Sequence, residues 1–481
     1  MNKINEKQMI LKHKFKTKSS IILLAFFFAS SISGQTITID DALKIALDNN
    51  RDIKIAKLEV QKAEEAVDEA FGYALPSVDV SANFSHFLSK PKMAFPDFEA
   101  MLTNATYGIL FNEGVIPQDN SKLLPMQTKL QSFAQTNNFE TSAQVTQILF
   151  NSAVFRGIGA SQIYLDLSKE QLKAKTTEIV LVVKQAFYGA LLTKQMLDIT
   201  KASLANAEEN VANVNSYYRQ GLTSEYEMMQ AEVMVENIRP KVFELENVYK
   251  DTINKLKMVL GVDQNSDIEV VGEIKYEIKE IPEIEDASLQ AINKNYDLSS
   301  LKVKKQIDEE FIALDRSEYW PQLAAFGNYT YAGSSDEWNF QNYSSTTVGL
   351  AFSINIFNGG RTKNKVEQSL IGLRQTEEQI NTLQDYTVTE VKKTINDIER
   401  VKIQIDAVER NVKLAERAYE ISVTRYNEGT GTQLEVKNAN IELQTAKTNR
   451  LQVVHDYIIA FAKLDRLLGQ LTVQEINFLK N

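Results

Sequence analysis

Residues 74–85, Ala-Leu-Pro-Ser-Val-Asp-Val-Ser-Ala-Asn-Phe-Ser, decide the fold of this chain. The preceding segment, residues 40–73, is rich in Ala, Lys, Glu and Leu and predicts a helix. Pro76 ends that helix because proline lacks a backbone N–H and clashes with the preceding turn. Beyond it, apolar residues alternate with Ser, Asp and Asn, which predicts a strand with one apolar face. The same switch recurs at Pro321, after a predicted helix over residues 285–318.

Three further segments are predicted strands: residues 323–331 and 348–356 alternate clearly, and residues 141–150 alternate less regularly. About ten alternating residues suit a soluble sheet with one wet face, and they also suit a transmembrane β-strand. We favour the membrane interpretation because the strands form two hairpins set between very long helices, with aromatic residues near their ends. These aromatic residues are Phe84, Phe87, Trp320, Tyr329, Tyr331 and Phe357. Four strands cannot close a barrel, which needs about eight, so this interpretation requires several chains.

The chain consists of two copies of one unit, which is a strong fold signal. Residues 39–86 align with residues 284–331 without a gap. Identical pairs include Asn50/Asn295, Pro76/Pro321, Tyr218/Tyr426, Gly221/Gly429, Glu227/Glu435 and Leu260-Gly261/Leu468-Gly469. The predicted division is a signal peptide (1–34), repeat 1 (35–261) with an inserted loop at about 88–126, a linker (262–284), repeat 2 (285–469) and a C-terminal tail (470–481).

Each copy contains a long predicted helix, over residues 153–219 and 361–427, with no Pro in either. At 1.5 Å per residue such a helix is a rod of roughly 100 Å. A heptad seam predicts coiled-coil packing of the second rod; it comprises Val391, Ile395, Ile398, Ile405, Val408, Val412, Ala415 and Tyr419. Short turns then reverse the chain: Gly221 and Gly429 suit a left-handed helix end, and Ser224 and Thr432 suit the cap of the next helix.

The N-terminus has the order of a secretory signal peptide: lysines, an apolar run over residues 21–29, then small residues up to Gly34. The alternative is an N-terminal membrane anchor, which the shortness of the apolar run disfavours. The 481 residues contain no Cys and three His, and the net charge is −10. We therefore expect no lipidated N-terminal Cys, no metal site, no cofactor and no nucleic-acid partner, and we predict that the chain is not an enzyme.

Several motifs resemble the TolC family of outer-membrane efflux proteins. They are residues 38–50 (Thr-Ile-Asp-Asp-Ala-Leu-Lys-Ile-Ala-Leu-Asp-Asn-Asn), the Ala-Leu-Pro76 and Tyr-Trp-Pro321 corners, residues 355–361 (Asn-Ile-Phe-Asn-Gly-Gly-Arg) and the duplicated Tyr-x-x-Gly turns followed by Glu and Ala. The resemblance implies an α+β membrane protein: a homotrimer with a 12-stranded transmembrane β-barrel, four strands per chain, in the lipid of the bacterial outer membrane. A long coiled-coil α-helical barrel would extend from it into the periplasm.

The same resemblance implies a function and partners. Family members are exit ducts of tripartite efflux pumps and of type I secretion systems. The expected partners are a periplasmic adaptor (membrane fusion protein) and an inner-membrane transporter of the RND, ABC or a similar class. Two alternatives stay open: a periplasmic coiled-coil adaptor or structural protein, and a hydrolase that uses a carboxylate pair.

The resemblance also places candidate sites at the helical turns. The pore-constriction candidates are Glu435, Asn438 and Glu227, and a ring of Glu435 would bind cations. The alternative is that Glu435 only favours the helix N-terminus through the helix dipole. The candidate adaptor-contact residues at the tips are Tyr218, Gly221, Leu222, Thr223, Tyr426, Gly429 and Thr430. We further expect the inserted loop at about 88–126 to lie outside the cell, where it would lid the pore.

Overall fold

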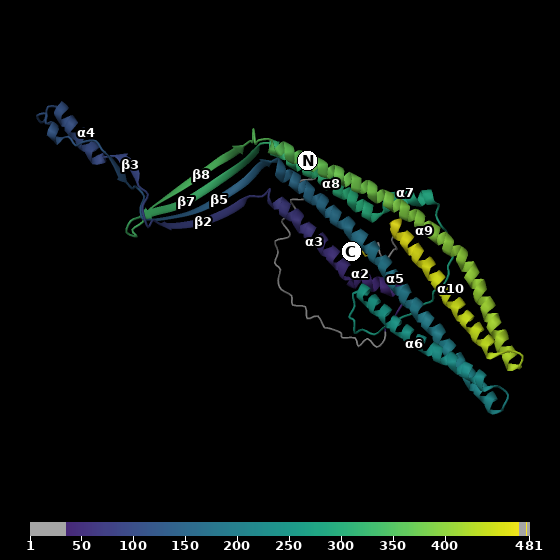
Figure 1. Cartoon of the computed structure of the whole chain (residues 1–481). Helices are drawn as coiled ribbons and strands as arrows, with labels where there is room; N and C mark the ends of the chain where they lie inside the picture. The colour runs from purple at the N-terminus through teal and green to yellow at the C-terminus, as the bar shows by residue number, and fades with distance from the viewer. Residues whose placement is uncertain (1–34, 471–477, 479–481) are drawn as a thin grey trace, which may run out of the picture.

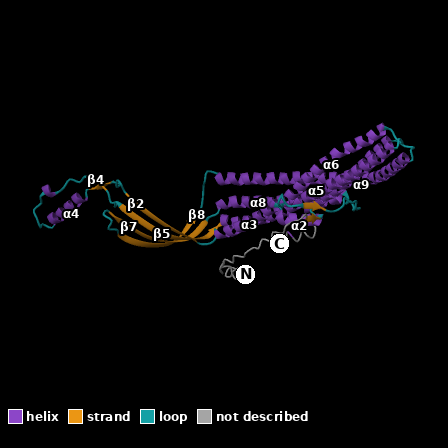
Figure 2. Ribbon diagram, turned by 90° about the horizontal axis from the view of Figure 1, so that it is seen from below, coloured by secondary structure: helices purple, strands orange, loops and turns teal. Residues whose placement is uncertain are grey.

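The computed structural model describes residues 35–470 and residue 478. The predicted signal peptide and most of the predicted tail therefore lie outside the described residues. The molecule is elongated: a small arm lies at one end, a sheet follows it, and the long helices run to the other end (Figures 1 and 2). None of the described helices is long and apolar enough to cross a bilayer.

The sheet has four strands: β2 (Ser77–His86), β5 (Asn137–Asn151), β7 (Gln322–Ser335) and β8 (Gln341–Ser353). Their order is β2-β5-β7-β8, and every neighbouring pair is antiparallel. All four predicted strands exist, but the last one, predicted over residues 348–356, begins and ends earlier, as β8. It ends at Ser353 because the chain then turns toward the next helix through Gly359 and Gly360, which have φ of 69° and 78°.

The strand register separates the side chains by polarity, because successive residues of a strand point to opposite faces. One row across the sheet pairs Val78 with Val145, Gly327 and Val348. The next residue along each strand belongs to the other face, where the hydroxyl groups of Ser81 and Ser142 lie 2.8 Å apart. The apolar face is uncovered in the single chain, and Val348 is 80% exposed. A sheet with a bare apolar face must be covered by something other than water.

Two long helical hairpins extend from the sheet (Figure 1). The first consists of α5 (Ser152–Arg219) and α6 (Glu225–Leu260), and the second consists of α9 (Arg361–Asn427) and α10 (Gln433–Leu467). Both predicted rods are confirmed, since no proline interrupts either of them. The predicted heptad seam is also confirmed in α9, where Val391, Ile395, Ile398 and Ile405 are all buried.

Each of the two shorter predicted helices, residues 40–73 and 285–318, is broken in two, so the prediction of one continuous helix was wrong in both halves. The pieces are α2 (Ile39–Asn49) and α3 (Arg51–Gly72) in the first half, and α7 (Ile284–Lys294) and α8 (Tyr296–Arg316) in the second. Asn50 and Asn295 stand at the breaks. The side-chain oxygen of Asn295 accepts from the N–H groups of Asp297 and Leu298 at 3.0 and 3.1 Å, so it caps α8 and interrupts the helix.

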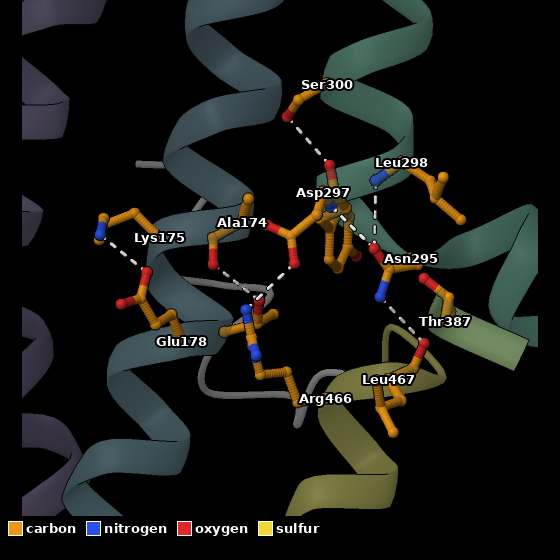
Figure 3. A network of polar contacts seen from close by, with 12 residues as sticks. Ala174, Lys175, Glu178, Asn295, Asp297, Leu298, Ser300, Thr387, Arg466 and Leu467 are labelled. Atoms are coloured by element: carbon orange, nitrogen blue, oxygen red, sulfur yellow. Dashed lines mark hydrogen bonds and ion pairs between the residues drawn. The ribbon is translucent and has the colours of Figure 1, made fainter. Parts of the chain in front are cut away.

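The same asparagine fastens the break to the end of the neighbouring hairpin (Figure 3). The amide of Asn295 donates to the carbonyl of Leu467 at 3.2 Å, and the amide of Asn50 donates to the carbonyl of Val259 at 2.7 Å. At the second corner, Arg466 also pairs with Asp297 at 3.1 Å. We call these two junctions the asparagine corners.

A glycine completes each corner. Gly261 and Gly469 have φ of 72° and 63°, a conformation that favours glycine. A Cβ atom at Gly469 would lie 2.1 Å from the carbonyl oxygen of Lys294, and one at Gly261 would lie 2.4 Å from that of Asn49. The short helices therefore abut the ends of α6 and α10 backbone to backbone.

The main hydrophobic core lies between the corners, where α2 and α7 pack against α5 and α9. Phe187, Leu256, Leu298 and Tyr457 are among the largest fully buried or nearly buried side chains. A short parallel pair, β1 (Gln35–Ile37) and β6 (Ile268–Val270), closes one side of this core. The predicted linker therefore contributes a strand, which its sequence did not indicate.

The segment predicted as an inserted loop is folded. It contains β3 (Met93–Pro96), α4 (Phe98–Asn112), a 3-10 turn (Asn120–Lys122) and β4 (Thr128–Gln131), and β3 pairs antiparallel with β4. It extends from the end of the sheet that lies away from the helices (Figure 2). We call residues 88–133 the distal arm.

Candidate functional site

The two hairpin turns lie together at the end of the molecule opposite to the sheet (Figure 1). Gly221 and Gly429 follow the ends of α5 and α9 with φ of 74° and 72°. Ser224 caps α6 by accepting from the N–H of Glu227, and Thr432 caps α10 by accepting from the N–H of Glu435, both at 3.3 Å. These local predictions are confirmed, and they fix the two carboxylates in the first turn of each returning helix.

The first tip presents apolar side chains to its surroundings. Tyr218 and Leu222, two of the predicted contact residues, are exposed, and Thr223 is partly exposed. Tyr226 is also exposed, at 65%, and the sequence reasoning missed it. An aromatic residue in the first turn after a capping serine was the signal that could have found it. This tip therefore offers an apolar surface with a hydroxyl rim.

Glu227 is held inside the first tip. The hydroxyl of Thr223 donates to its carboxylate, so two residues that were predicted for different roles contact each other. Glu227 is partly buried. Its carboxylate is therefore oriented by a neutral donor.

The second tip holds its carboxylate differently. Glu435 forms an ion pair with Arg425, with Arg425 Nη1 3.3 Å from Glu435 Oε2. Arg425 also donates to the carbonyl of Thr430 at 3.0 Å, and the N–H of Thr430 donates back to the carbonyl of Arg425 at 2.9 Å. Arg425 was missed by the sequence reasoning. It is the central residue of this turn, because it neutralises Glu435 and fastens the loop.

Asn438 lies one helical turn beyond Glu435 and is exposed. Residues three apart share a helix face, so Asn438 presents an uncharged amide beside the Glu435 carboxylate. Tyr426 is partly buried, whereas Gly429 and Thr430 are exposed at the outermost part of the turn. The structure thus places all of the predicted constriction and contact residues at one end of the molecule.

A row of uncharged polar contacts joins the two hairpins above the tips, and the sequence reasoning did not find it. Asn210 donates to Gln433 at 2.8 Å, Asn440 donates to Ser203 at 2.9 Å, and Gln444 donates to Thr200 at 3.3 Å. Gln433 and Asn440 are only 2% and 4% exposed. Buried polar pairs of this kind fix the register of packed helices, because sliding one helix along the other would leave these groups without partners. The contacts therefore fix the axial position of α10 against α5.

The charges of the sheet lie on one face. Asp79 and Glu140 are the only charged residues within β2, β5, β7 and β8. Asp79 pairs with Gln144, and Glu140 pairs with Asn83, so both belong to the face that carries the Ser81 and Ser142 hydroxyls. The sheet therefore has an uncharged apolar face and an acidic polar face.

Comparisons with known proteins agree with this arrangement. The family model "Outer membrane efflux protein" matches residues 42–262 and 288–470. The outer membrane protein TolC of Vibrio cholerae serotype O1 is 21% identical over 312 residues, which are 64% of this chain and 71% of that protein. The alkaline protease secretion protein AprF of Pseudomonas aeruginosa is 19% identical over 340 residues, 70% of either chain.

Solved structures show the same fold. The CmeC outer membrane channel of Campylobacter jejuni is 16% identical, covers 90% of this chain and 85% of its own, and superposes with a TM-score of 0.70. These relatives favour a channel over the alternative of a periplasmic adaptor. Because the family model covers most of both halves, the chain belongs to the outer membrane efflux protein family, and it is an outer-membrane channel, as its motifs predicted.

Proposed function

We propose that three copies of this chain close a 12-stranded β-barrel in the outer membrane and form the exit duct of a tripartite efflux or type I secretion system. In this proposal each chain supplies two tandem repeats, residues 35–261 and 285–469, joined by the linker 262–284. The observation that carries the proposal is the sheet: its two faces differ in polarity, and the outer edges of β2 and β8 have no partner strand among the described residues.

An isolated four-stranded sheet with open edges is not a stable membrane structure, because unpaired backbone groups are costly in lipid. Pairing β8 of one copy with β2 of the next removes every edge. The apolar face, with Val80 and Leu350, then meets lipid, and the acidic face, with Asp79 and Glu140, lines the lumen. A lumen with carboxylates and no cationic side chain favours cations over anions.

The helical hairpins supply the rest of the wall. A helix of about 67 residues spans roughly 100 Å, so α5 and α9 carry the duct far from the membrane surface. The tips lie at the far end, where the periplasmic adaptor and the inner-membrane transporter would dock. Tyr218, Leu222 and Tyr226 form the apolar contact surface in this proposal, and Glu435 is the constriction residue.

Two adjacent threonines of β8 provide the test. Thr346 pairs with Tyr329 on the apolar face, and Thr347 pairs with Asn328 on the acidic face. We expect Thr346→Lys to reduce trimer incorporation into the outer membrane, because a lysine facing lipid near the midplane costs about 2–4 kcal/mol. We expect Thr347→Lys to incorporate normally and to lower the cation preference, measured as the reversal potential in planar bilayers.

Wild-type protein supplies the reference for both variants. It is extracted in detergent, its mass is measured by light scattering, and its conductance is recorded in a bilayer. Equal incorporation and equal selectivity of the two lysine variants would contradict the assignment of the faces. A monomer in detergent that forms no conducting pore would contradict the trimeric duct itself.

A further inference from the structure

The helix of the distal arm carries an exposed apolar stripe. Phe98, Met101, Leu102, Ala105 and Ile109 of α4 follow one another at spacings of three, one, three and four, which places them on one helix face. All of them are exposed; Leu102 is 70% exposed and Ile109 is 63% exposed. An apolar stripe of this width is typical of a helix that packs on a partner.

The opposite side of α4 is already occupied by the arm itself. Ala100 is fully buried, and Asn104 exchanges two hydrogen bonds with the backbone of Leu124, at 2.8 and 2.7 Å. Asp97 caps the helix and forms an ion pair with Lys129 of β4 at 2.5 Å. Phe98, at the start of the stripe, contacts the rings of Phe95 and Phe133 of the arm. The rest of the stripe, from Met101 to Ile109, is exposed and faces away from the arm.

The arm is fastened at its base, so the stripe has a defined position. Asp336, in the turn between β7 and β8, pairs with Lys90 and accepts from the N–H and hydroxyl of Thr136 at 2.9 and 2.8 Å. Lys90 and Thr136 hold the pKa of Asp336 down to about 2, so this contact persists at any physiological pH. Beside it, the rings of Phe84 and Trp338 stack with centroids 6.0 Å apart.

We propose that the stripe of α4 packs against the same helix of the neighbouring copies, above the mouth of the barrel. This inference rests on the proposed trimer, which sets the copies around one axis. The arm follows β2, the edge strand that a neighbouring copy extends, so the interface continues from the sheet into the arm. In this proposal, the α4 helices of the three copies pack on one another and the distal arms together cover the pore.

Charge favours a second copy over lipid. Glu99 is the only charged residue of α4 and lies off the stripe, and Glu113 follows the helix beyond Ile109, the last residue of the stripe, so no like charges oppose one another along the stripe when three copies meet. The rest of the arm carries seven more charged residues: Lys90, Lys92, Asp97, Glu113, Asp119, Lys122 and Lys129. Sinking the arm into lipid would bring these charges to the membrane with the stripe, at a high desolvation cost.

The chain contains no Cys, so single cysteines report contacts without background. We expect Leu102→Cys and Ile109→Cys, in the full-length trimer, to give disulfide-linked subunits after mild oxidation, because the Cα atoms of a disulfide lie within about 7 Å. Thr103→Cys is the matched control, since it is partly exposed on the same helix and points away from the stripe. We expect it to remain unlinked although it reacts with a maleimide.

Each other outcome has a distinct meaning. A detergent-stable trimer without crosslinks at positions 102 and 109 would overturn the inference and leave the proposed function intact. A fluorophore at Leu102→Cys that is quenched by lipid-borne spin labels would overturn it in favour of lipid. Failure to form a trimer at all would instead refute the proposed function on which the inference rests.

Discussion

The two hairpin tips hold equivalent carboxylates with different partners. When the sequences of the two halves are aligned, Tyr217 corresponds to Arg425, and Thr223 corresponds to Gly431. The first tip holds Glu227 with the Thr223 hydroxyl, whereas the second holds Glu435 with the Arg425 guanidinium. The second tip has no hydroxyl at position 431, where a Cβ would lie only 3.1 Å from the Cβ of Arg425.

The asparagine corners show the opposite behaviour. Asn50 and Asn295 make the same cap and the same bond to a helix-end carbonyl, and Gly261 and Gly469 make the same close approach. The residues that form the corners are thus equal in both halves of the chain, while the partners of the two tip carboxylates differ. We infer that the corner residues stabilise the fold, whereas the tip residues determine the charge presented to the ion path of the channel.

The largest effect is expected at a corner glycine. Gly469→Ala combines a left-handed backbone, at about 1–2 kcal/mol, with a Cβ that collides with the carbonyl of Lys294. We expect a loss of at least about 2 kcal/mol in the free energy of unfolding, measured by denaturant titration in detergent, together with a low yield of folded trimer.

Gly221→Ala is the matched control at a tip. Its φ of 74° is similar, but a Cβ there would meet nothing within 4 Å, so only the backbone term remains. We expect Gly221→Ala to lower the free energy of unfolding by less than Gly469→Ala does, with a difference of more than about 1 kcal/mol, because only Gly469→Ala adds a steric collision. An equal decrease in the free energy of unfolding for both variants would show that the close backbone approach at Gly469 does not restrict that position more than the turn restricts Gly221.

The next effect concerns the asparagines. Asn50→Ala and Asn295→Ala each remove a helix cap, at about 1 kcal/mol, and leave a helix-end carbonyl without its donor. We expect each to lower the free energy of unfolding by about 2 kcal/mol. Asn→Asp at either position keeps the capping oxygen but turns a charged oxygen toward the helix-end carbonyl in place of the donor, so we expect a loss of stability even though the cap remains. A clear difference between the two corners would contradict their equivalence.

The rods and strands could be predicted from the sequence, but the corners could not. Long proline-free segments and clear alternation identify α9 and β2 because the signal is repeated over many residues. The break at Asn50 depends on one cap, and its donor reaches Val259, which lies far along the chain. The signal was present as Asn50-Arg-Asp52 and Asn295-Tyr-Asp297, a capping residue followed by an acidic first turn.

The tips were predicted only in part. Glu435 was predicted from the family resemblance, and Glu227 is its equivalent in the first half, but Arg425 contacts Glu435 across a turn, and that contact depends on the turn conformation. The distal arm was predicted as a loop because α4 has apolar residues on more than one side, which obscures the helical period. Only the structure shows which of its sides is already covered.

The smallest effect on stability, and the most informative for function, comes from exchanging the partners of the two carboxylates. Arg425→Tyr makes the second tip resemble the first. Arg425 and Glu435 are 51% and 44% exposed, so the pair contributes at most about 1 kcal/mol to folding. If Glu435 lines the constriction, removing the guanidinium uncovers a carboxylate in each subunit, and the cation preference must rise.

The measurement is the reversal potential of single channels at low salt, because the Debye length is about 10 Å at 0.1 M and higher salt would screen the effect.

Adding Glu435→Gln to Arg425→Tyr must abolish the increase in cation preference, since no uncovered charge remains. Tyr217→Arg is the reciprocal change: it offers Glu227 a cation and is expected to lower the cation preference if Glu227 also faces the pore. An unchanged reversal potential in all three variants would mean that neither carboxylate faces the ion path, and that Glu435 acts on the helix dipole alone.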